Sequence, residues 1–363
     1  MMDAPWPQPG TLLSDIVTPV PVIDEARLAG NIARVQDYMD SIGRGFRPHI
    51  KTHKLPEVAA LQLAAGAVGV NCQKVTEAEV FADAGIEDIL ITYNILGPVR
   101  LARLKALNAR VPKLSVTADN GVVVAGLAAT FGADRPLTVL VECDTSGARC
   151  GVQTPAQAVE LALRIAAAEG LRFGGVMTYP APGKAAQVEA FLAETLRLLG
   201  ERGMECPVVS VGGTPDLFLS HEIASATEHR AGTCVYNDRS MVRAGHAGAE
   251  HCAMHVLTTV VSRPTEDRAI LDAGSKSLTS DLLGFQDYGA IEGYPGARIV
   301  GLSEEHGTVD LSGVEGDRPQ VGDVLRVVPN HTCVVTNLFD RMIFHDGDKV
   351  TRVLDVAARG KVW

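Results

Sequence analysis

The chain has 363 residues, and at about 150 residues per domain this length predicts two domains. With 46% hydrophobic and 21% charged residues, it can bury a large core and is not a disordered polymer. Its 33 basic and 43 acidic residues give a formal net charge of −10, which argues against a nucleic-acid or anionic-membrane partner, because both require a basic surface.

The sequence carries no evident signal for export or membrane insertion. Residues 1–10 lack a basic segment followed by an apolar one, so no signal peptide is expected. The most apolar stretches, such as residues 121–133, are too short to span a bilayer. Seven cysteines without a Cys-x-x-Cys pair indicate reduced thiols, and we therefore expect a cytoplasmic protein.

Between residues 20 and 240, short β-type runs alternate with helical stretches that have apolar residues at positions i, i+3 and i+4. The β-type runs are Val20–Ile23, Arg47–Ile50, Val68–Asn71, Ile89–Tyr93, Lys113–Thr117, Leu137–Glu142, Phe173–Thr178 and Val208–Val211. The clearest helical stretches are Ala26–Met39, Pro56–Ala65, Glu77–Ala84, Pro155–Ala168 and Ala185–Arg202. A doubly wound sheet gives the same alternation, but eight strand–helix units favour a (β/α)8 barrel, the TIM-barrel architecture.

The alternation ends near Gly245, where short β-type runs follow one another without a long helix. These runs are His251–Ser262, Ala269–Leu271, Ala297–Leu302, Val324–Val328, Cys333–Asn337 and Arg341–Phe344. Turns rich in Gly, Pro and Asp separate them, which is typical of a mostly antiparallel β domain. The sequence therefore predicts an α/β chain with a barrel over residues 15–245 and a C-terminal β domain over residues 246–363.

Polar side chains follow most of the predicted barrel strands, where the active site of such a barrel lies. They include His49, Lys51, Lys54, Gln73, Lys74, Arg149, Tyr179 and Thr214. A lysine held among other cations can have its pKa lowered enough to form a Schiff base, and any of the three lysines fits, although each could also be an ordinary surface residue. The Gly212-Gly213-Thr214 and Gly232-Thr233 segments can offer backbone N–H groups to a phosphate, or can simply be turns.

In the C-terminal domain, Pro329-Asn330-His331-Thr332-Cys333 suggests a metal site. Alternate residues of a strand face the same way, so His331 and Cys333 could bind one ion. Imidazole with thiolate favours Zn²⁺ or a neighbouring transition metal, whereas the alternative is a histidine and a cysteine packed in a β core. The Glu304-Glu305-His306-Gly307 segment could add a ligand or be a solvated turn.

Taken together and in this order, these segments resemble the fold-type III pyridoxal-phosphate (PLP) enzymes, and most closely the D-threonine aldolase and D-serine dehydratase family. The resemblance covers roughly residues 15–363. It is carried by Thr18-Pro19, Arg47-Pro48-His49-Ile50-Lys51, Cys72-Gln73-Lys74-Val75, Gly147-Ala148-Arg149-Cys150-Gly151, Val211-Gly212-Gly213-Thr214, Leu271-Asp272-Ala273-Gly274, Glu305-His306-Gly307, His331-Thr332-Cys333 and Ala357-Ala358-Arg359-Gly360.

The resemblance implies a homodimeric enzyme with PLP in the barrel, a divalent metal (Mn, Co or Zn) in the β domain and a small D-amino acid as substrate. Lys51 matches the Schiff-base lysine, with His49 as a further catalytic residue. Arg149 matches an arginine near the pyridine nitrogen, where a guanidinium keeps that nitrogen unprotonated. The positions around the ring and phosphate are matched by Gln73, Tyr179, Gly213, Thr214, Gly232 and Thr233. His331 and Cys333 match the metal pair.

Two reactions are open within this family. Cleavage of the Cα–Cβ bond of a D-3-hydroxy amino acid gives glycine and an aldehyde, whereas loss of the β-hydroxyl from D-serine or D-3-hydroxyaspartate gives a keto acid and ammonia. Residues Arg47–Lys54 and Cys72–Glu79 resemble the aldolases, and we place the aldolase first. Cys333 follows the dehydratase pattern, and Pro180–Lys184 lacks a histidine found in aldolases. An amino-acid racemase would leave the metal pair unexplained, and a metal hydrolase would need more His and Asp at the strand ends.

Overall fold

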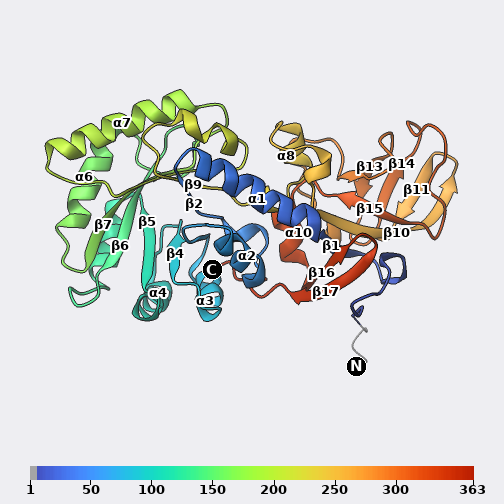
Figure 1. The fold of residues 1–363 in the computed structure, drawn as a ribbon, viewed down its shortest axis with the longest axis horizontal. Coiled ribbons are helices and arrows are strands. Elements are labelled where there is room, and N and C mark those ends of the chain that lie inside the picture. Colours follow the sequence, from blue (N-terminus) through green and yellow to red (C-terminus); the bar gives the residue numbers. More distant parts are fainter. Residues whose placement is uncertain (1–5) are drawn as a thin grey trace. The chain divides into compact units, whose positions relative to one another are not determined.

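Eight parallel strands form one sheet in the computed structural model, which describes residues 6–363 (Figure 1). Their order along the sheet is β2-β9-β8-β7-β6-β5-β4-β3. Their bounds are β2 Gly45–Phe46, β3 Val70–Cys72, β4 Asp88–Ile91, β5 Lys113–Ala118, β6 Leu137–Cys143, β7 Leu171–Thr178, β8 Val208–Gly212 and β9 Glu228–Arg230. Just beyond β2, His49 forms a parallel bridge with Asn71 of β3, so the two ends of the sheet meet. The predicted (β/α)8 barrel is confirmed.

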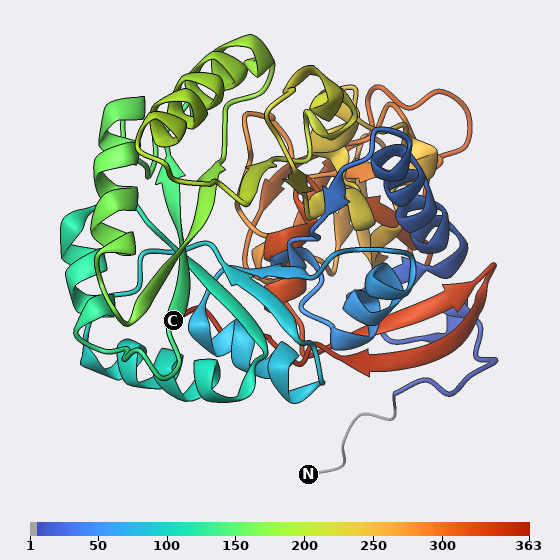
Figure 2. The same ribbon diagram turned by 60° about the vertical axis from the view of Figure 1, so that its left-hand side comes forward.

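Helices connect the barrel strands and lie along the outer side of the sheet (Figure 2). They are α2 Pro56–Ala64, α3 Val75–Asp83, α4 Pro98–Arg110, α5 Gly121–Ala128, α6 Pro155–Ala166 and α7 Ala185–Glu201, and α1 Glu25–Ser41 precedes β2. Helix α6 is an example of how the sequence determines where such a helix begins and which face it buries. Thr154 and Gln157 form a capping box at its start, and residues such as Leu161 and Ile165 give it one buried apolar face.

A second sheet combines strands from both ends of the chain. Its main order is β13-β14-β11-β10-β1-β16-β17, and β15 pairs with β10 and β12. Among the described residues, its pairs are antiparallel except β1 with β16, which confirms the predicted mostly antiparallel β domain. Its strands are β1 Val20–Asp24, β10 Met254–Thr265, β11 Arg268–Leu271, β12 Ala290–Ile291, β13 Arg298–Leu302, β14 Gly307–Asp310, β15 Val324–Val328, β16 Arg341–Asp346 and β17 Lys349–Asp355. Short helices α8 Arg239–Arg243, α9 Ser275–Leu278 and α10 Thr332–Leu338 accompany it.

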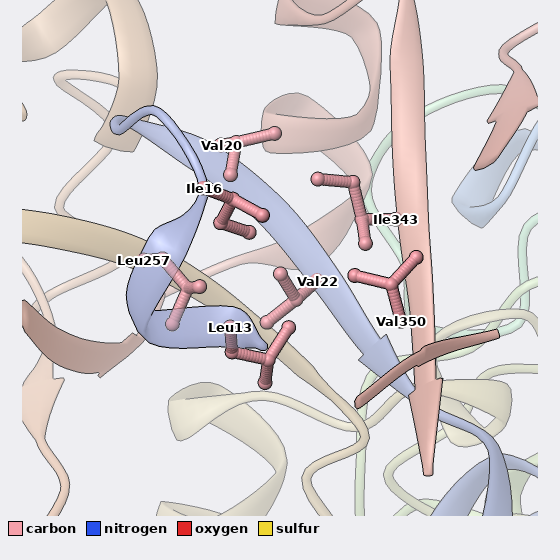
Figure 3. Close-up of a cluster of buried hydrophobic side chains, with 7 residues drawn as sticks. All are labelled: Leu13, Ile16, Val20, Val22, Leu257, Ile343 and Val350. Atoms are coloured by element: carbon pink, nitrogen blue, oxygen red, sulfur yellow. The ribbon is translucent and has the colours of Figure 1, made fainter. Parts of the chain in front are cut away.

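An aliphatic cluster fastens the N-terminal strand into this sheet (Figure 3). Val22 of β1 pairs with Ile343 of β16 on one side, and Val20 pairs with Leu257 of β10 on the other. The buried members of the cluster are Leu13, Ile16, Val20, Val22, Leu257, Ile343 and Val350. Removal of these side chains from water is the main force that holds the two ends of the chain in one sheet.

One predicted barrel strand was misplaced and one barrel strand was missed. Val20–Ile23 was expected as the first barrel strand, but it is β1 of the second sheet, where both faces are buried. The eighth barrel strand is instead β9, whose residues Glu228, His229 and Arg230 are polar yet buried. A hydrophobic pattern cannot reveal a strand whose side chains are buried through ion pairs and hydrogen bonds.

The predicted strand Cys333–Asn337 was also wrong, because this segment forms helix α10. Its Val and Thr residues favour a strand by propensity. Thr332, Val335 and Thr336 are nevertheless buried together, at the i, i+3 and i+4 spacing of one helix face. Thr336 also donates a hydrogen bond to the carbonyl oxygen of Thr52 at 2.6 Å. Tertiary packing therefore overrides the local preference.

The described residues fall into two compact units. The barrel unit contains Arg34–Lys51, Pro56–Gly232 and Lys361–Trp363. The sheet unit contains the described residues up to Ala33, together with Thr52–Leu55 and Thr233–Gly360. The expected boundary lies at residue 245, whereas here β1 belongs to the second sheet and the segment from Thr233 onward is grouped with the sheet unit.

The seven cysteines, all within the described residues, form no disulfide bonds there. No helix within residues 6–363 is long and apolar enough to cross a membrane. Residues 1–5, part of the segment on which the prediction of no signal peptide rests, lie outside the described residues.

Candidate active site

Lys51 lies in a single 3-10 turn, Ile50–Thr52, that follows β2 at the C-terminal end of the barrel. Its neighbour His49 is fixed by Gln73, which follows β3. The Gln73 side-chain amide donates to the Thr92 carbonyl at 3.1 Å, so its oxygen must face His49 Nε2, also at 3.1 Å. His49 Nε2 therefore carries the proton, and Nδ1 accepts a long hydrogen bond from the Lys51 backbone N–H at 3.4 Å.

Hydrogen bonds hold the His49 ring in place. Both of its ring nitrogens are engaged, one with Gln73 and one with the Lys51 backbone. Gln73 is itself anchored, because its backbone N–H donates to the buried Glu77 carboxylate at 2.7 Å. The structure thus brings His49, Gln73 and Lys51 together, and the catalytic role expected for His49 stays a prediction.

The three candidate lysines have different surroundings. Lys54 is 5% exposed and its ammonium donates to the Ala358 carbonyl at 3.2 Å, so it has a structural partner. The Lys74 ammonium lies 3.5 Å from the centroid of the Tyr93 ring, a cation–π contact. Within the described residues, the half-buried Lys51 side chain has no recorded hydrogen bond, ion pair or ring contact. Lys51 is thus the lysine whose amine can condense with a carbonyl without losing another contact.

Arg230, at the end of β9, is a buried cation that the sequence prediction missed. Its guanidinium donates to Ser210 Oγ at 2.7 Å and to the Thr178 carbonyl at 2.6 Å. Burial lowers the pKa of Arg230 to about 10, although the carboxylates of Glu228 and Glu142 oppose that shift. Within the sequence nearby, the Glu-His-Arg triplet that contains Arg230 is too polar for its hydropathy to predict a strand.

Arg149 occupies a different environment, on an exposed loop after β6. Its guanidinium lies 4.6 Å from the centroid of the Tyr179 ring, so the structure brings these two predicted residues together. Burial raises the pKa of Glu142, and the positive charges of Arg230 and Arg149 oppose this rise. Both guanidinium groups therefore act on one carboxyl at this end of the barrel.

Glycines create close backbone approaches beside Tyr179. A Cβ on Gly147 would lie 2.4 Å from the Tyr179 carbonyl oxygen, and Gly213 has a φ of +130° that only glycine adopts readily. A small cavity of about 90 Å³ is lined by Gly147, Tyr179, Pro180, Ala181, Pro182, Gly212, Gly213, Pro215 and Asp216.

The backbone N–H and carbonyl groups of Gly213 both form hydrogen bonds. Its N–H donates to the Arg230 carbonyl at 2.9 Å, and its own carbonyl accepts from His229 Nε2 at 2.9 Å. Among the described residues, Thr214 has no recorded partner for its N–H or its hydroxyl. These groups, on a glycine-lined turn, fit a phosphate better than the engaged Gly213 N–H does.

The predicted metal pair lies at the start of helix α10 rather than on a strand. His331 is the N-cap residue and Cys333 lies in the first turn. Burial disfavours a charged His331 ring, but the neighbouring Cys333 sulfur and Asp238 carboxylate outweigh burial and raise the pKa of His331 to about 11. An imidazole and a thiol in mutual contact are suitable donors for a Zn-like transition metal.

Hydroxyl groups surround the Cys333 sulfur. Thr52 Oγ1, in the residue that follows Lys51, lies 3.1 Å from it, and Thr233 Oγ1 lies 3.9 Å from it. Thr233, expected near the phosphate beside Gly232, is thus grouped with the metal pair within the sheet unit. Residues 304–307 do not add a ligand, because Glu304 and Glu305 are exposed and both pair with Lys276.

No cluster of three or more His, Cys, Asp or Glu suited to a metal occurs among residues 6–363.

The fold and this site define an alanine racemase-type barrel. Residues 23–240 match the family described as "Alanine racemase, N-terminal domain", and residues 253–345 match a family of serine dehydratase domains. The chain is 36% identical to a D-threonine aldolase from an Arthrobacter species, over 98% of this chain and 96% of the relative. It is also 36% identical to a D-threo-3-hydroxyaspartate dehydratase from Delftia sp. (strain HT23), over 89% and 92% of the two chains.

Solved structures of related enzymes superpose closely on this chain. The crystal structure of D-threonine aldolase from Filomicrobium marinum superposes with a TM-score of 0.90 at 32% identity, over 98% of this chain and all of that one. Two structures of a D-threo-3-hydroxyaspartate dehydratase, a histidine-to-alanine and a cysteine-to-alanine variant, have TM-scores of 0.87 and 0.86 at 32% and 33% identity. They cover 95% of this chain and 96% and 98% of theirs, respectively.

The chain therefore belongs to the D-threonine aldolase and D-serine dehydratase family, as its sequence motifs predicted. It is a PLP-dependent lyase, and the enzyme class expected from the sequence is confirmed.

Proposed function

We propose that this enzyme is a divalent-metal-dependent D-threonine aldolase-like lyase, which cleaves D-3-hydroxy amino acids to glycine and an aldehyde. The observation that carries this proposal is the 3.1 Å contact between Cys333 Sγ and the hydroxyl of Thr52, the residue that follows Lys51. Chain continuity thus links the proposed Schiff-base lysine to the proposed metal pair. Similarity to a D-threonine aldolase over 98% of the chain supports the reaction.

Each proposed role uses a feature of the described residues. Lys51 would hold PLP, which supplies an electron sink for the substrate's α-carbon. Thr214, beside Gly213 on the glycine-lined turn, would bind the phosphate, and Tyr179 would lie against the ring. The roles expected for Gly232 and Thr233 at the phosphate remain predictions. His331 and Cys333 would hold a metal that supplies a Lewis acid for the β-hydroxyl. The aldolase reaction breaks the Cα–Cβ bond, moves the hydroxyl proton to a base and returns a proton to Cα.

Two arginines can serve the pyridine nitrogen. Arg149 was assigned this role by resemblance, whereas Arg230 is the buried one and is fixed by Ser210 and the Thr178 carbonyl. A guanidinium at this position would keep the ring nitrogen unprotonated. Absorption spectra of Arg149→Leu and Arg230→Leu holoenzymes distinguish them, because only loss of the true partner changes the spectrum of the bound cofactor.

A dehydratase remains the second candidate, and the metal ligands favour it. In the related D-threo-3-hydroxyaspartate dehydratase, the histidine and cysteine replaced by alanine lie two residues apart, and the cysteine variant was solved in a metal-free form. His331 and Cys333 have the same spacing. In that reaction Lys51 would take the Cα proton and the β-hydroxyl would leave.

One product assay decides between the two. Purified enzyme is incubated with D-threonine and with D-serine, and glycine plus acetaldehyde is measured against keto acid plus ammonia. Glycine plus acetaldehyde from D-threonine supports the aldolase, whereas keto acid plus ammonia supports the dehydratase. If neither product forms with PLP and Mn²⁺, Co²⁺ or Zn²⁺ present, both proposals are wrong.

A chelator tests the metal. Activity should disappear after chelation and return with one or more of the three metals, and activity indifferent to chelation would leave His331 and Cys333 as packing residues. The homodimer and the cytoplasmic location remain predictions. Light scattering after size-exclusion chromatography tests the first.

A further inference from the structure

We propose that Asp238 is a positioning residue for the metal pair, which orients His331 and determines which ring nitrogen is available to the metal. The inference rests on the proposed metal site, but it concerns a residue that the sequence analysis did not select. Asp238 and His331 are 93 positions apart in the chain, so only the fold brings them together.

The geometry around Asp238 is that of a fixed acceptor. Its side chain is fully buried, and Oδ2 lies 2.9 Å from His331 Nδ1. The same oxygen accepts from the backbone N–H of Thr332 at 3.1 Å and, more weakly, from its hydroxyl at 3.4 Å. One carboxylate oxygen therefore holds the histidine ring and the first turn of α10 together.

The chemistry of these groups fixes the tautomer. A carboxylate only accepts hydrogen bonds, so His331 Nδ1 carries a proton and Nε2 is left for the metal. Carboxylates behind metal-binding histidines orient the ring and make it a stronger ligand, and their removal typically weakens metal binding by about 10–100-fold. Asp238 has the position that this role requires.

A purely structural role is the competing explanation, because Asp238 is also the N-cap of α8. Its other oxygen, Oδ1, accepts from the Met241 backbone N–H at 3.1 Å and from Ser240 Oγ at 2.6 Å. The two oxygens thus have separate partners, one in α8 and one at the metal pair. This separation allows the two roles to be tested independently.

The backbone around the site does not depend on the carboxylate alone. The Arg239 N–H donates to the Pro329 carbonyl at 3.1 Å, and the Ser240 N–H donates to the Asn330 carbonyl at 3.3 Å. These bonds tie the start of α8 to the segment that leads into His331. A variant that keeps the cap should therefore fold.

Asp238→Ser is the main test variant. Serine caps helices about as well as aspartate, but it is too short to reach both Met241 N–H and His331. Ser240→Ala is the matched control, because it removes a partner of Oδ1 and leaves Oδ2 on His331. Metal-free protein is titrated with Co²⁺, whose thiolate charge-transfer absorption reports Cys333, and with Zn²⁺ in competition with a chromophoric chelator. Circular dichroism and the melting temperature of the metal-free protein check the fold.

We expect Asp238→Ser to melt close to wild type and to bind both metals about 10–100-fold more weakly, while Ser240→Ala binds them as wild type does. Wild-type affinity in Asp238→Ser would overturn the inference. If Asp238→Ser does not fold, Asp238→Asn replaces it. The asparagine variant removes the charge at constant shape, and an unchanged affinity and Co²⁺ spectrum there would also overturn the inference.

The controls separate this inference from the proposed function. Wild-type protein that binds no metal, or a His331→Ala variant with undiminished affinity, would remove the metal site itself. Normal metal binding by wild type together with normal binding by Asp238→Ser would leave the metal site intact and reject only the role of Asp238.

Discussion

The barrel unit contains a buried network of charged side chains, whereas the sheet unit contains a buried cluster of aliphatic side chains. Inside the barrel, Arg47, Glu228 and Arg230 are each less than a tenth exposed. Glu228 accepts from Arg47 Nε at 3.0 Å and from Ser210 Oγ at 2.7 Å, and Ser210 also accepts from Arg230. In the sheet unit, the buried members of the cluster around Val22 and Ile343 are all aliphatic, and the partly buried Trp6 packs against them.

This difference shows what each interior contributes. A buried charge is costly unless it is paired, so the barrel network must be satisfied at every member. It places a fixed cation, Arg230, at the strand ends where the proposed cofactor site lies. The aliphatic cluster provides burial alone, and it should tolerate small changes of volume. Substitutions in the charged network and in the aliphatic cluster should therefore differ in their effect on stability.

The largest expected effect is on catalysis, from Lys51→Ala. Loss of the proposed Schiff-base amine should reduce turnover by at least about 10²–10⁴-fold, since both reactions would depend on the cofactor that it holds and the dehydratase would also use it as a base. Steady-state kinetics on D-threonine measures it, with Lys74→Ala as the matched control, because the Lys74 ammonium already contacts Tyr93. Borohydride reduction followed by peptide mapping should find the cofactor on Lys51. Cofactor on Lys54 or Lys74 would contradict the assignment.

The next effect is on stability, from Glu228→Gln in the barrel network. Arg47 would lose one of its two carboxylate partners and keep Asp88 at 2.7 Å. Breaking a buried pair on one side costs about 3–5 kcal/mol, and the remaining Asp88 contact favours the lower end. Urea unfolding followed by circular dichroism measures the change.

The matched control is Glu194→Gln, which breaks an exposed pair with Arg197 on α7. Exposed ion pairs contribute little, so its unfolding midpoint should stay at the wild-type value. Equal midpoint shifts for the two variants would show that the barrel network carries no special stability.

The contrast between the units also explains how far the fold could be predicted from sequence. Seven of the eight predicted β-type runs lie in or beside barrel strands, because buried parallel strands such as β4 and β6 are short, largely apolar runs. Strand β9 escaped prediction because its Glu-His-Arg side chains are buried through partners distant in sequence. Strand β1 was misplaced for the reverse reason, since its apolar run looks the same in either sheet.

The site shows the same limit. Lys51, His331 and Cys333 could be selected because their sequence neighbours form recognisable motifs. Arg230 and Asp238 could not, because their importance comes from contacts with Thr178 and His331, 52 and 93 positions away. His331 and Cys333 were expected to face the same way along a strand. They are instead close together because both lie at the start of helix α10.

A smaller effect should appear on acidification, through His229 in β9. Burial lowers the pKa of His229 to about 4, although a hydrogen bond to the Gly213 carbonyl opposes this, and an unfolded histidine titrates near 6.5. Between these values the unfolded chain binds a proton that the folded chain excludes. Stability should therefore fall as the pH drops from 6.5 towards 4, by up to about 3 kcal/mol.

Unfolding free energies at pH 7 and pH 5 test this for wild type and His229→Gln. The variant should lose part of the pH dependence, whereas the exposed His306→Gln should keep all of it. An identical pH dependence in wild type and His229→Gln would show that His229 is not excluded from protonation in the folded barrel.

The smallest effect is expected in the aliphatic cluster, from Ile343→Val. Ile343 is 1% exposed, and it packs with Val22, its partner across the β1–β16 pair. Removing one methylene group should cost about 0.5–1.5 kcal/mol, well below the cost of Glu228→Gln, because no charge is left unpaired. Val321→Ala, at a 60% exposed position of the same unit, is the control and should change stability by less than about 0.5 kcal/mol. If Ile343→Val were as damaging as Glu228→Gln, tight packing rather than charge pairing would set the sensitivity of both interiors, and the contrast between the two units would fail.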